Sequence, residues 1–310
     1  MKKADYDLVI IGGGPAGLTA GLYAARARMK VIMLEKITPG GQILVTDWIE
    51  NYPGFPEGIS GIELVQRMTD QVKRFDLAVE SAEVSALDVS QPIKKVTLTD
   101  GNEVTAHALI IATGASPNPL GVPGESKFSG RGVSFCGTCD GPFFRGKVVA
   151  AVGGGDTAVQ ESIFLTKFAS KVYLIHRRNE FRAEKILQER AFANEKIEII
   201  WDSVVTEISG LTNVEKVSIK NVKTNETRDL AVAGCFIWVG TRPNTQFVGD
   251  AIKVDENGFI IADVNMKTSV PGVFVAGDVR NTPLRQVVTA VGDAAIAVAS
   301  AEHYLENLSR

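Results

Sequence analysis

One strand–turn–helix pattern occurs twice in this chain of 310 residues, and it dictates most of the fold that the chain can adopt. The first copy has an apolar run at 6–11 and the pattern Gly-x-Gly-x-x-Gly at 12–17, followed by a stretch rich in small residues. The second copy has an apolar run at 148–152 and a turn at 153–158, where Ala158 takes the third small position. A glycine turn between a buried strand and a helix is typical of dinucleotide-binding folds. We therefore expect an α/β protein with two Rossmann-like dinucleotide-binding domains.

The residues of the first turn match the physical needs of a dinucleotide. Gly12 permits the tight turn, Gly14 lets a pyrophosphate approach the backbone, and Gly17 lets helix and strand pack closely. The N-terminus of the helix offers free N–H groups and the positive end of its dipole to the phosphates. A second strand at 31–34 ends in Glu35, whose carboxylate can accept hydrogen bonds from ribose hydroxyls.

The second copy carries bases where the first carries an acid. Its second strand, at 171–175, runs into His176, Arg177 and Arg178, and Arg182 follows. A carboxylate would repel a 2′-phosphate, whereas guanidinium groups bind it through charge-assisted hydrogen bonds. The first site therefore suits a ribose with free hydroxyls and the second suits NADPH; a solvated basic surface turn is the alternative interpretation. The turn residues that we assign to NADPH are Gly153, Gly155, Asp156 and Thr157.

The order of the apolar segments predicts a discontinuous domain. An apolar strand before residue 116 leads into Ser116-Pro117-Asn118-Pro119, which should break secondary structure and act as a linker. We expect residues 1–116 and 245–310 to form one dinucleotide-binding domain, with the NADPH-binding domain at 117–244 inserted into it. Two adjacent crossings would make a natural hinge. The chain should end in a long helix at about 286–308, dense in Ala and Val.

Composition excludes several classes of protein. The net charge is −3 without a notable Lys/Arg run, so neither nucleic acid nor a membrane surface is indicated as a partner. The apolar runs are too short to span a bilayer, and we expect a cytoplasmic protein. Three cysteines and three scattered histidines do not predict a closed zinc site, which needs about four ligands, and we expect no metal. Cys235, in an apolar run, should be an inert buried thiol.

Two cysteines, Cys136 and Cys139, lie just ahead of the second glycine turn. A lone C-x-x-C is weak evidence, because redox pairs and half zinc sites share it. Between two dinucleotide-binding turns, however, the same spacing predicts a dithiol that exchanges electrons with both cofactors.

Together these motifs resemble one family over essentially the whole chain. They are Gly12–Gly17, Gly40-Gly41-Gln42, Glu50-Asn51-Tyr52-Pro53-Gly54, Ala112-Thr113-Gly114-Ala115, Cys136-Gly137-Thr138-Cys139-Asp140-Gly141, Gly153–Ala158, His176-Arg177-Arg178 and Ala276-Gly277-Asp278-Val279. The chain closely resembles the bacterial low-molecular-weight thioredoxin reductases, which are flavoprotein pyridine nucleotide-disulfide oxidoreductases. Gly137, where alanine is usual, and Gln160, where glutamate is common, depart from the family pattern.

The resemblance implies a homodimeric FAD enzyme that passes electrons from NADPH to thioredoxin. In this family the second cysteine, here Cys139, faces the flavin, the first, here Cys136, attacks thioredoxin, and the following acid, here Asp140, handles protons. Phe143, Phe144 and Arg131 are candidate contacts for thioredoxin, although core packing is equally natural for the phenylalanines. The residues implied for FAD are Gly12, Gly14, Pro15, Ala16, Gly17, Glu35, Gly41, Gln42, Asn51, Val84, Ala112, Thr113, Gly114, Gly277, Asp278, Arg285 and Gln286.

The layout also implies motion, and it leaves two other functions open. The dithiol and the NADPH site share the inserted domain, so a rotation about the linkers would alternate which of them faces the flavin. The first alternative is a related reductase or oxidase of another dithiol or disulfide; the intact His176-Arg177-Arg178 argues against the oxidase. The second is a non-catalytic flavoprotein that binds partners according to redox state, and retention of Cys136, Cys139 and Asp140 argues against it.

Overall fold

The computed structural model describes residues 4–46 and 48–309, without the side chains of Val45, Thr138, Cys139 and Ser309. The chain divides into two compact units. Unit 1 comprises Met1–Ser116 and Arg242–Arg310, and unit 2 comprises Pro117–Thr241. The segment expected as an insertion spans 117–244, and unit 2 ends three residues earlier, at Thr241. Which cofactor each unit holds stays a prediction.

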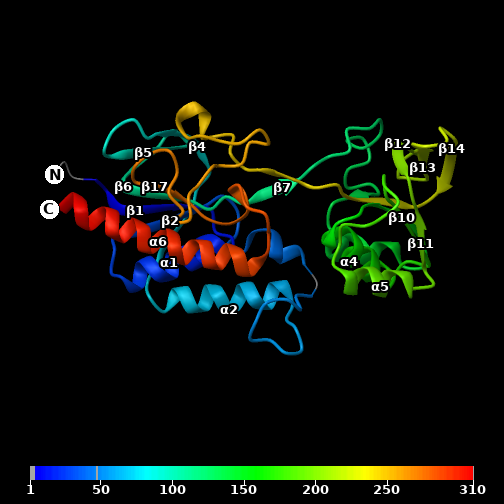
Figure 1. Ribbon diagram of the computed structural model, residues 1–310, viewed down its shortest axis with the longest axis horizontal. Helices are drawn as coiled ribbons and strands as arrows, with labels where there is room; N and C mark the ends of the chain where they lie inside the picture. The colour runs from blue at the N-terminus through cyan, green and yellow to red at the C-terminus, as the bar shows by residue number, and fades with distance from the viewer. Residues whose placement is uncertain (1–3, 47, 310) are drawn as a thin grey trace. The chain divides into compact units, whose positions relative to one another are not determined.

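Unit 1 is built on a mixed sheet with the strand order β3-β2-β1-β6-β5-β4, in which β17 also pairs with β6 (Figure 1). The strands are β1 (Tyr6–Ile11), β2 (Val31–Glu35), β3 (Ala78–Ser81), β4 (Val84–Asp88), β5 (Lys94–Leu98), β6 (Glu103–Ile111) and β17 (Val273–Val275). Strands β3, β2, β1, β6 and β17 run parallel, and β5 and β4 are added antiparallel. The central parallel strands are apolar and buried along most of their length, as expected when both faces of a sheet are covered.

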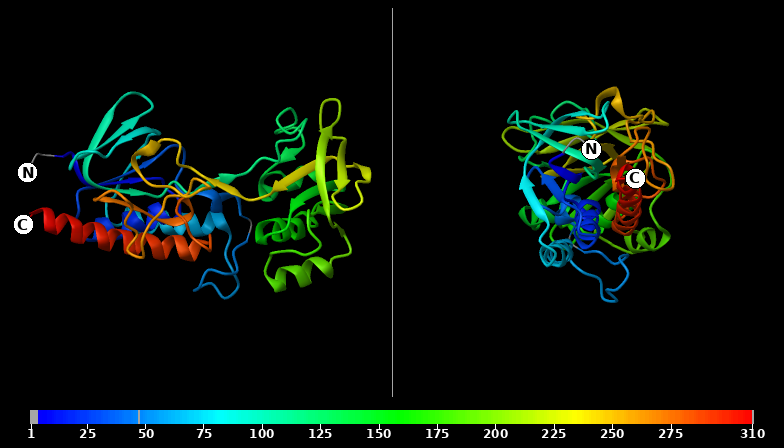
Figure 2. Two further views of the ribbon diagram at one scale, coloured as in Figure 1. Left: turned by 45° about the horizontal axis from the view of Figure 1, so that its top comes forward. Right: turned by 90° about the vertical axis from the view of Figure 1, so that its left-hand side faces the viewer.

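Three helices lie on one side of this sheet, as Figures 1 and 2 show. They are α1 (Pro15–Arg26), α2 (Gly61–Lys73) and α6 (Val287–Ser309), and unit 1 also has the short 3-10 helices η1 (Gly41–Val45), η3 (Gly249–Ala251) and η4 (Gly277–Val279). α1 and α6 pack together through alanines that are fully buried, among them Ala20, Ala24 and Ala297. Small side chains let the two helix backbones approach closely. The predicted C-terminal helix is therefore confirmed, and α6 begins one residue later than expected.

Unit 2 has a five-stranded parallel sheet with the order β11-β10-β9-β15-β8. Its strands are β8 (Val133–Ser134), β9 (Val148–Gly153), β10 (Lys171–Ile175), β11 (Ile197–Ile200) and β15 (Gly234–Trp238). One face of the sheet shares a core with the helices α4 (Asp156–Leu165) and α5 (Lys185–Phe192). The other face shares a core with an antiparallel sheet of β12 (Ser203–Ser209), β13 (Lys216–Asn221) and β14 (Thr227–Ala231). The parallel strands at the centre of each unit, with their crossover helices, confirm the predicted α/β class.

The two crossings between the units contain a short sheet that the sequence did not predict. Residues Ala115–Pro117 form β7, which pairs with β16 (Thr241–Pro243). The expectation that secondary structure breaks at Ser116 and Pro117 is therefore wrong. Proline lacks a backbone N–H, yet a two-stranded ribbon has two free edges on which the missing donor costs nothing.

Candidate functional site

The first glycine turn, between β1 and α1, combines glycines that the protein itself needs with one that it does not. Gly12 has φ +103°, and a Cβ on it would lie 2.5 Å from the carbonyl oxygen of Ala112. A Cβ on Gly17 would overlap the carbonyl oxygen of Gly12. A Cβ on Gly14, by contrast, would have Gly41 Cα as its nearest atom, at 3.9 Å. The open space at Gly14, beside the free N–H groups of a helix N-terminus, fits a phosphate group.

The side chain of Glu35, at the end of β2, stabilises this turn through hydrogen bonds. Its Oε2 accepts a hydrogen bond from the N–H of Gly13 at 2.7 Å, and its Oε1 accepts one from the N–H of Ile37 at 3.0 Å. A carboxylate oxygen has more than one acceptor site. Glu35 can therefore hold the turn and still accept a ribose hydroxyl.

Residues far apart in the sequence meet this turn because β1, β6 and β17 are parallel neighbours. Ala112, Thr113 and Gly114 follow β6, and the Ala112 N–H donates to the carbonyl of Ile11 at 2.8 Å. Gly277 follows β17, and a Cβ on it would lie 3.1 Å from the Ala16 side chain. The carboxyl ends of adjacent parallel strands are where ligands bind in open α/β sheets.

Most of the remaining residues predicted to bind FAD lie around the same edge. Gly41 opens η1, where a Cβ would lie 3.2 Å from Gly14 Cα, and Gln42 follows it, exposed. Asn51 donates through Nδ2 to Gln286 Oε1 at 3.0 Å, which joins two predicted residues directly. Val84 begins β4, shortly after β3 pairs with the end of β2 at Glu35. Pro15 is the first residue of α1, where its missing N–H is harmless.

The carboxyl group of Asp278, which follows β17, lies in a desolvated environment. Burial raises its pKa to about 6; the nearby Arg285 opposes this rise and the charge of Asp293 adds to it. Arg285 is fixed above the ring of Phe259, with its guanidinium carbon 3.9 Å from the ring centroid. A desolvated carboxyl group at the edge of a nucleotide site is suited to accept hydrogen bonds from hydroxyl groups of a ligand.

Two residues that sequence reasoning missed hold the Gly277–Asp278 turn. Asp293 Oδ2 accepts hydrogen bonds from the Gly277 N–H at 3.1 Å and from Arg280 Nε at 2.7 Å. Its Oδ1 accepts a further bond from Arg280 Nη2 at 2.8 Å, and both side chains are largely buried. The available signal was an acid isolated within the apolar stretch 287–301.

We expect Asp293→Ala to lower the free energy of unfolding by about 3 kcal/mol, because it leaves the guanidinium of Arg280 buried without its partner. Chemical denaturation of the purified protein measures this. Asp70→Ala, which removes the exposed ion pair with Lys73, is the matched control and should leave stability unchanged. Equal effects of the two substitutions would show that the Asp293 pair has no special role.

The second glycine turn, between β9 and α4, likewise combines a glycine that the protein itself needs with one that it does not. Gly153 has φ +151°, and a Cβ there would overlap the carbonyl oxygen of Trp238. A Cβ on Gly155 would meet no atom within 4 Å. Asp156 and Thr157 open α4 directly after this space. The space at Gly155 therefore fits a second phosphate-bearing ligand.

The arginines that follow β10 lie on a loop anchored to this turn. Arg177, Arg178 and Arg182 are all exposed. The backbone N–H of Arg182 donates to the carbonyl of Gly154 at 2.7 Å, and the N–H of Glu184 donates to Asp156 Oδ1 at 2.7 Å. His176 differs from these neighbours, because it is only 6% exposed, and burial lowers its pKa.

The predicted dithiol lies between β8 and β9, where Cys136 immediately precedes α3 (Gly137–Asp140) and Cys139 lies within it. Ser134 Oγ accepts from the N–H of Cys136 at 3.0 Å and lies 3.1 Å from its carbonyl oxygen, to which it can donate. Trp238 Nε1 donates to the carbonyl of Phe135 at 3.1 Å, which ties the same segment to β15. Cys136 is disulfide-bonded. The side chain of Cys139 lies outside the described residues.

The remaining predicted residues near α3 differ in how exposed they are. Asp140 is half-buried at the end of α3. Of the two phenylalanines on η2 (Gly141–Phe144), Phe143 is 72% exposed, whereas Phe144 is buried in the core of unit 2. Cys235 is fully buried and free, and burial raises the pKa of its thiol to about 12, which confirms the expected inert thiol.

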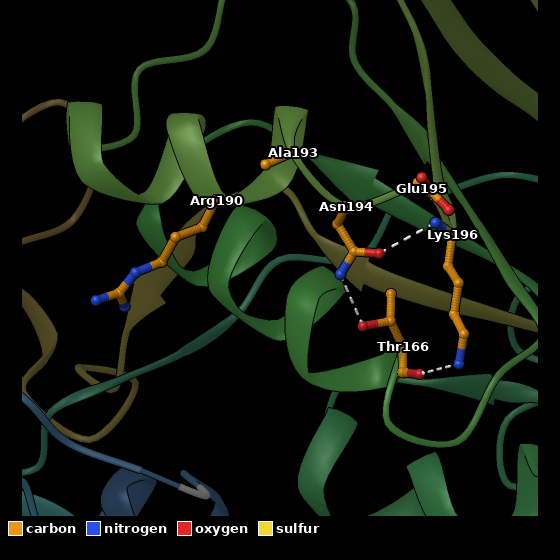
Figure 3. Close-up of a pocket in the computed structure, with 6 residues that line it drawn as sticks. All are labelled: Thr166, Arg190, Ala193, Asn194, Glu195 and Lys196. Carbon is orange, nitrogen blue, oxygen red and sulfur yellow. Dashed lines mark hydrogen bonds between the residues drawn. The ribbon is translucent and has the colours of Figure 1, made fainter.

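A cavity of about 580 Å³ elsewhere in unit 2 contains none of the predicted site residues (Figure 3). It is lined by Thr166, Arg190, Ala193, Asn194, Glu195 and Lys196. Lys196 Nζ donates to the carbonyl of Thr166 at 2.8 Å, and Asn194 Nδ2 donates to Thr166 Oγ1 at 3.0 Å. These hydrogen bonds connect the end of α4 to the segment before β11. The polar side chains that line the cavity therefore stabilise unit 2.

Within the described part of the chain, no helix is long and apolar enough to cross a membrane. Among the same residues, no group of three or more His, Cys, Asp or Glu side chains is placed to hold a metal ion.

A family model described as pyridine nucleotide-disulphide oxidoreductase matches residues 6–294. The chain belongs to this family. The chain is 47% identical over 309 residues to the thioredoxin reductase of Peptoclostridium litorale and covers 98% of each chain. It is 44% identical over 312 residues to the thioredoxin reductase of Bacillus subtilis, with 99% of this chain and 97% of that one covered.

Solved structures agree with these relatives. The thioredoxin reductase of Lactococcus lactis matches with a TM-score of 0.95 at 45% identity, over 98% of this chain and 100% of that one. The thioredoxin reductase of T. acidophilum matches with a TM-score of 0.92 at 35% identity, over 99% and 100% of the two chains. The resemblance predicted from the motifs is therefore confirmed over nearly the whole chain.

Proposed function

We propose that the protein is an NADPH-dependent thioredoxin reductase that uses bound FAD and a redox-active Cys136–Cys139 disulfide. The observation that carries this proposal is the pair of glycine turns, each with open space where the protein itself would tolerate a side chain. Two turns of this kind suit two dinucleotides. The similarity to thioredoxin reductases over the full chain supports the same reading.

We assign FAD to unit 1. The phosphates would lie at Gly14 and the N-terminus of α1, the adenosine ribose at Glu35, and the ribityl hydroxyls at Asp278. FAD, when bound, accepts a hydride from a nicotinamide and passes two electrons to a disulfide. The Asp293–Arg280 pair fixes the turn that carries Asp278, and would thereby hold Asp278 in place for FAD.

We assign the exchange with thioredoxin to the two cysteines. The thiolate of Cys136 attacks the thioredoxin disulfide, which forms a mixed disulfide and releases one thioredoxin thiolate. The thiolate of Cys139 then attacks Cys136 Sγ, which re-forms the internal disulfide and frees the second thioredoxin thiolate. Asp140, which directly follows Cys139 at the end of α3, would take up and return the protons of these thiols.

We assign the 2′-phosphate of NADPH to the loop after β10. We expect Arg177→Ala to raise the KM for NADPH about tenfold or more, because one hydrogen bond between charged groups contributes about 1.5–3 kcal/mol. The KM for NADH should stay nearly constant, since NADH lacks that phosphate. Steady-state kinetics with both nucleotides measure the ratio, and the exposed Arg228 on β14 provides a matched Arg→Ala control. Equal effects of Arg177→Ala on both nucleotides would place the 2′-phosphate elsewhere.

We further propose a cytoplasmic homodimer in which the units rotate about the two crossings, so that the dithiol and the NADPH site face the flavin in turn. The outward face of α6 supports a dimer contact, because Val288 and Ile296 are 41% and 42% exposed there and Gly292 has open space beside it. A cross-link that fixes the two units in one orientation should stop turnover if rotation is required.

The decisive experiment is NADPH oxidation by the purified protein with oxidised thioredoxin. We expect fast turnover, and a higher rate with NADPH than with NADH. A yellow protein whose flavin NADPH reduces, but which leaves thioredoxin oxidised, would point to another disulfide partner. Oxygen consumption with a small dithiol would indicate the oxidase, and absence of any turnover would indicate the redox-sensing flavoprotein.

A further inference from the structure

His176 lies beneath the second glycine turn, whereas the arginines around it are exposed. Its side chain is 6% exposed, and its Nε2 is buried without a hydrogen-bond partner among the described residues. Its ring packs beside two aromatic rings, with centroids 5.5 Å from Phe181 and 6.2 Å from Trp201. A phosphate oxygen has no access to that buried nitrogen.

The ring of His176 supports Gly154 directly. A Cβ built on Gly154 would overlap the imidazole ring, so only a glycine lets the turn rest on it. The backbone of Gly154 in turn accepts the hydrogen bond from Arg182, which anchors the arginine loop. The backbone of His176 is also fixed, since its N–H donates to the carbonyl of Ile200 at 2.9 Å and its carbonyl accepts from Ser203 at 3.0 Å.

The charge state of the ring agrees with this structural role. Burial lowers the pKa of His176, Arg182 and Arg178 lower it further, and the nearby carbonyls of Glu180 and Gly153 offset part of this. The neutral imidazole is therefore favoured at pH 7. A neutral ring adds no positive charge to a phosphate site.

We propose that His176 is a positioning residue, which holds the second glycine turn and the arginine loop in place, and that it is not a ligand of the 2′-phosphate. This inference rests on the proposed NADPH site. Within the sequence His176-Arg177-Arg178, the histidine would then support the turn from inside, and the two exposed arginines would bind the phosphate. The support acts on the turn that every dinucleotide uses, so its loss should affect nucleotides with and without the 2′-phosphate alike.

The test is the affinity for NADP⁺ and NAD⁺, measured by calorimetry on the purified holoenzyme. We expect His176→Ala to weaken both nucleotides by the same factor, about tenfold, whereas Arg177→Ala should weaken NADP⁺ alone. If His176→Ala weakens NADP⁺ at least tenfold more than NAD⁺, or changes neither affinity, the inference is overturned. If the wild-type protein binds neither nucleotide, the proposed function itself fails.

A second variant separates support of the turn from a general loss of folding. Gly154→Ala should weaken both nucleotides in the wild-type background, because its methyl group meets the ring of His176. In the His176→Ala background the same methyl group occupies vacated space, and we expect it to restore part of the affinity. Additive losses in the double variant would contradict the inference. Should His176→Ala fail to fold, nitrogen NMR of His176 in the wild-type protein decides: the ring should stay neutral when NADP⁺ binds, and conversion to imidazolium would overturn the inference.

Discussion

Replacement of Cys136 by serine is expected to abolish thioredoxin reduction, by about a thousandfold or more, while NADPH still reduces the bound flavin. A serine hydroxyl cannot form the mixed disulfide through which the electrons must leave. Flavin reduction precedes that step and needs no thiol. Stopped-flow absorbance of the flavin, followed by steady-state turnover with thioredoxin, separates the two halves of the reaction.

The remaining cysteine supplies the control for this experiment. Cys235 is fully buried on β15, so Cys235→Ala should leave turnover unchanged. Substantial turnover in Cys136→Ser would move the exchange with thioredoxin to another group. A flavin that NADPH no longer reduces in Cys136→Ser would indicate that the substitution disturbs more than the dithiol.

The second large effect is expected from Gly17→Ala. The new methyl group would overlap the carbonyl of Gly12, and neither backbone can retreat, because α1 packs against β1 and the turn is tied to β6. We expect the free energy of unfolding to fall by about 3 kcal/mol or more, with little folded protein recovered. Expression yield and thermal denaturation measure the outcome.

Gly14→Ala is the matched variant at the same turn. Its methyl group has space within the protein, so the stability of the flavin-free protein should be unchanged while FAD affinity falls about tenfold or more. Flavin fluorescence during titration of the flavin-free protein measures the affinity. If Gly14→Ala binds FAD normally, the phosphates do not approach the backbone at this turn.

The sequence predicted those parts of the structure that local patterns determine. The two glycine turns, their strands and the helix at 287–309 follow from short motifs and continuous apolar runs. The antiparallel strands β12 to β14 escaped prediction, because their alternation is short and their burial depends on packing against a distant sheet. The pairing of β7 with β16 joins residues far apart in sequence, which no local pattern reveals.

The same distinction between local and long-range determinants applies to the residues of the candidate site. The residue types at Gly12, Glu35 and Arg177 indicate a function, because the chemistry of each is local. Asp293 is different, since its role exists only through Arg280 and Gly277 on a separate segment. His176 lies in the same basic motif as the arginines, yet it packs against the rings of Phe181 and Trp201 and is buried, which no local pattern reveals.

The burial of Cys235 makes chemical labelling of this protein simple to interpret. Its thiol is inaccessible, and its pKa of about 12 keeps it protonated at any pH at which maleimides are used. The number of labels that the folded protein takes up therefore reports the C-x-x-C pair alone, without a cysteine-free background. Mass spectrometry of samples quenched at a series of ambient potentials would give the midpoint potential of that pair in the unmodified wild-type chain.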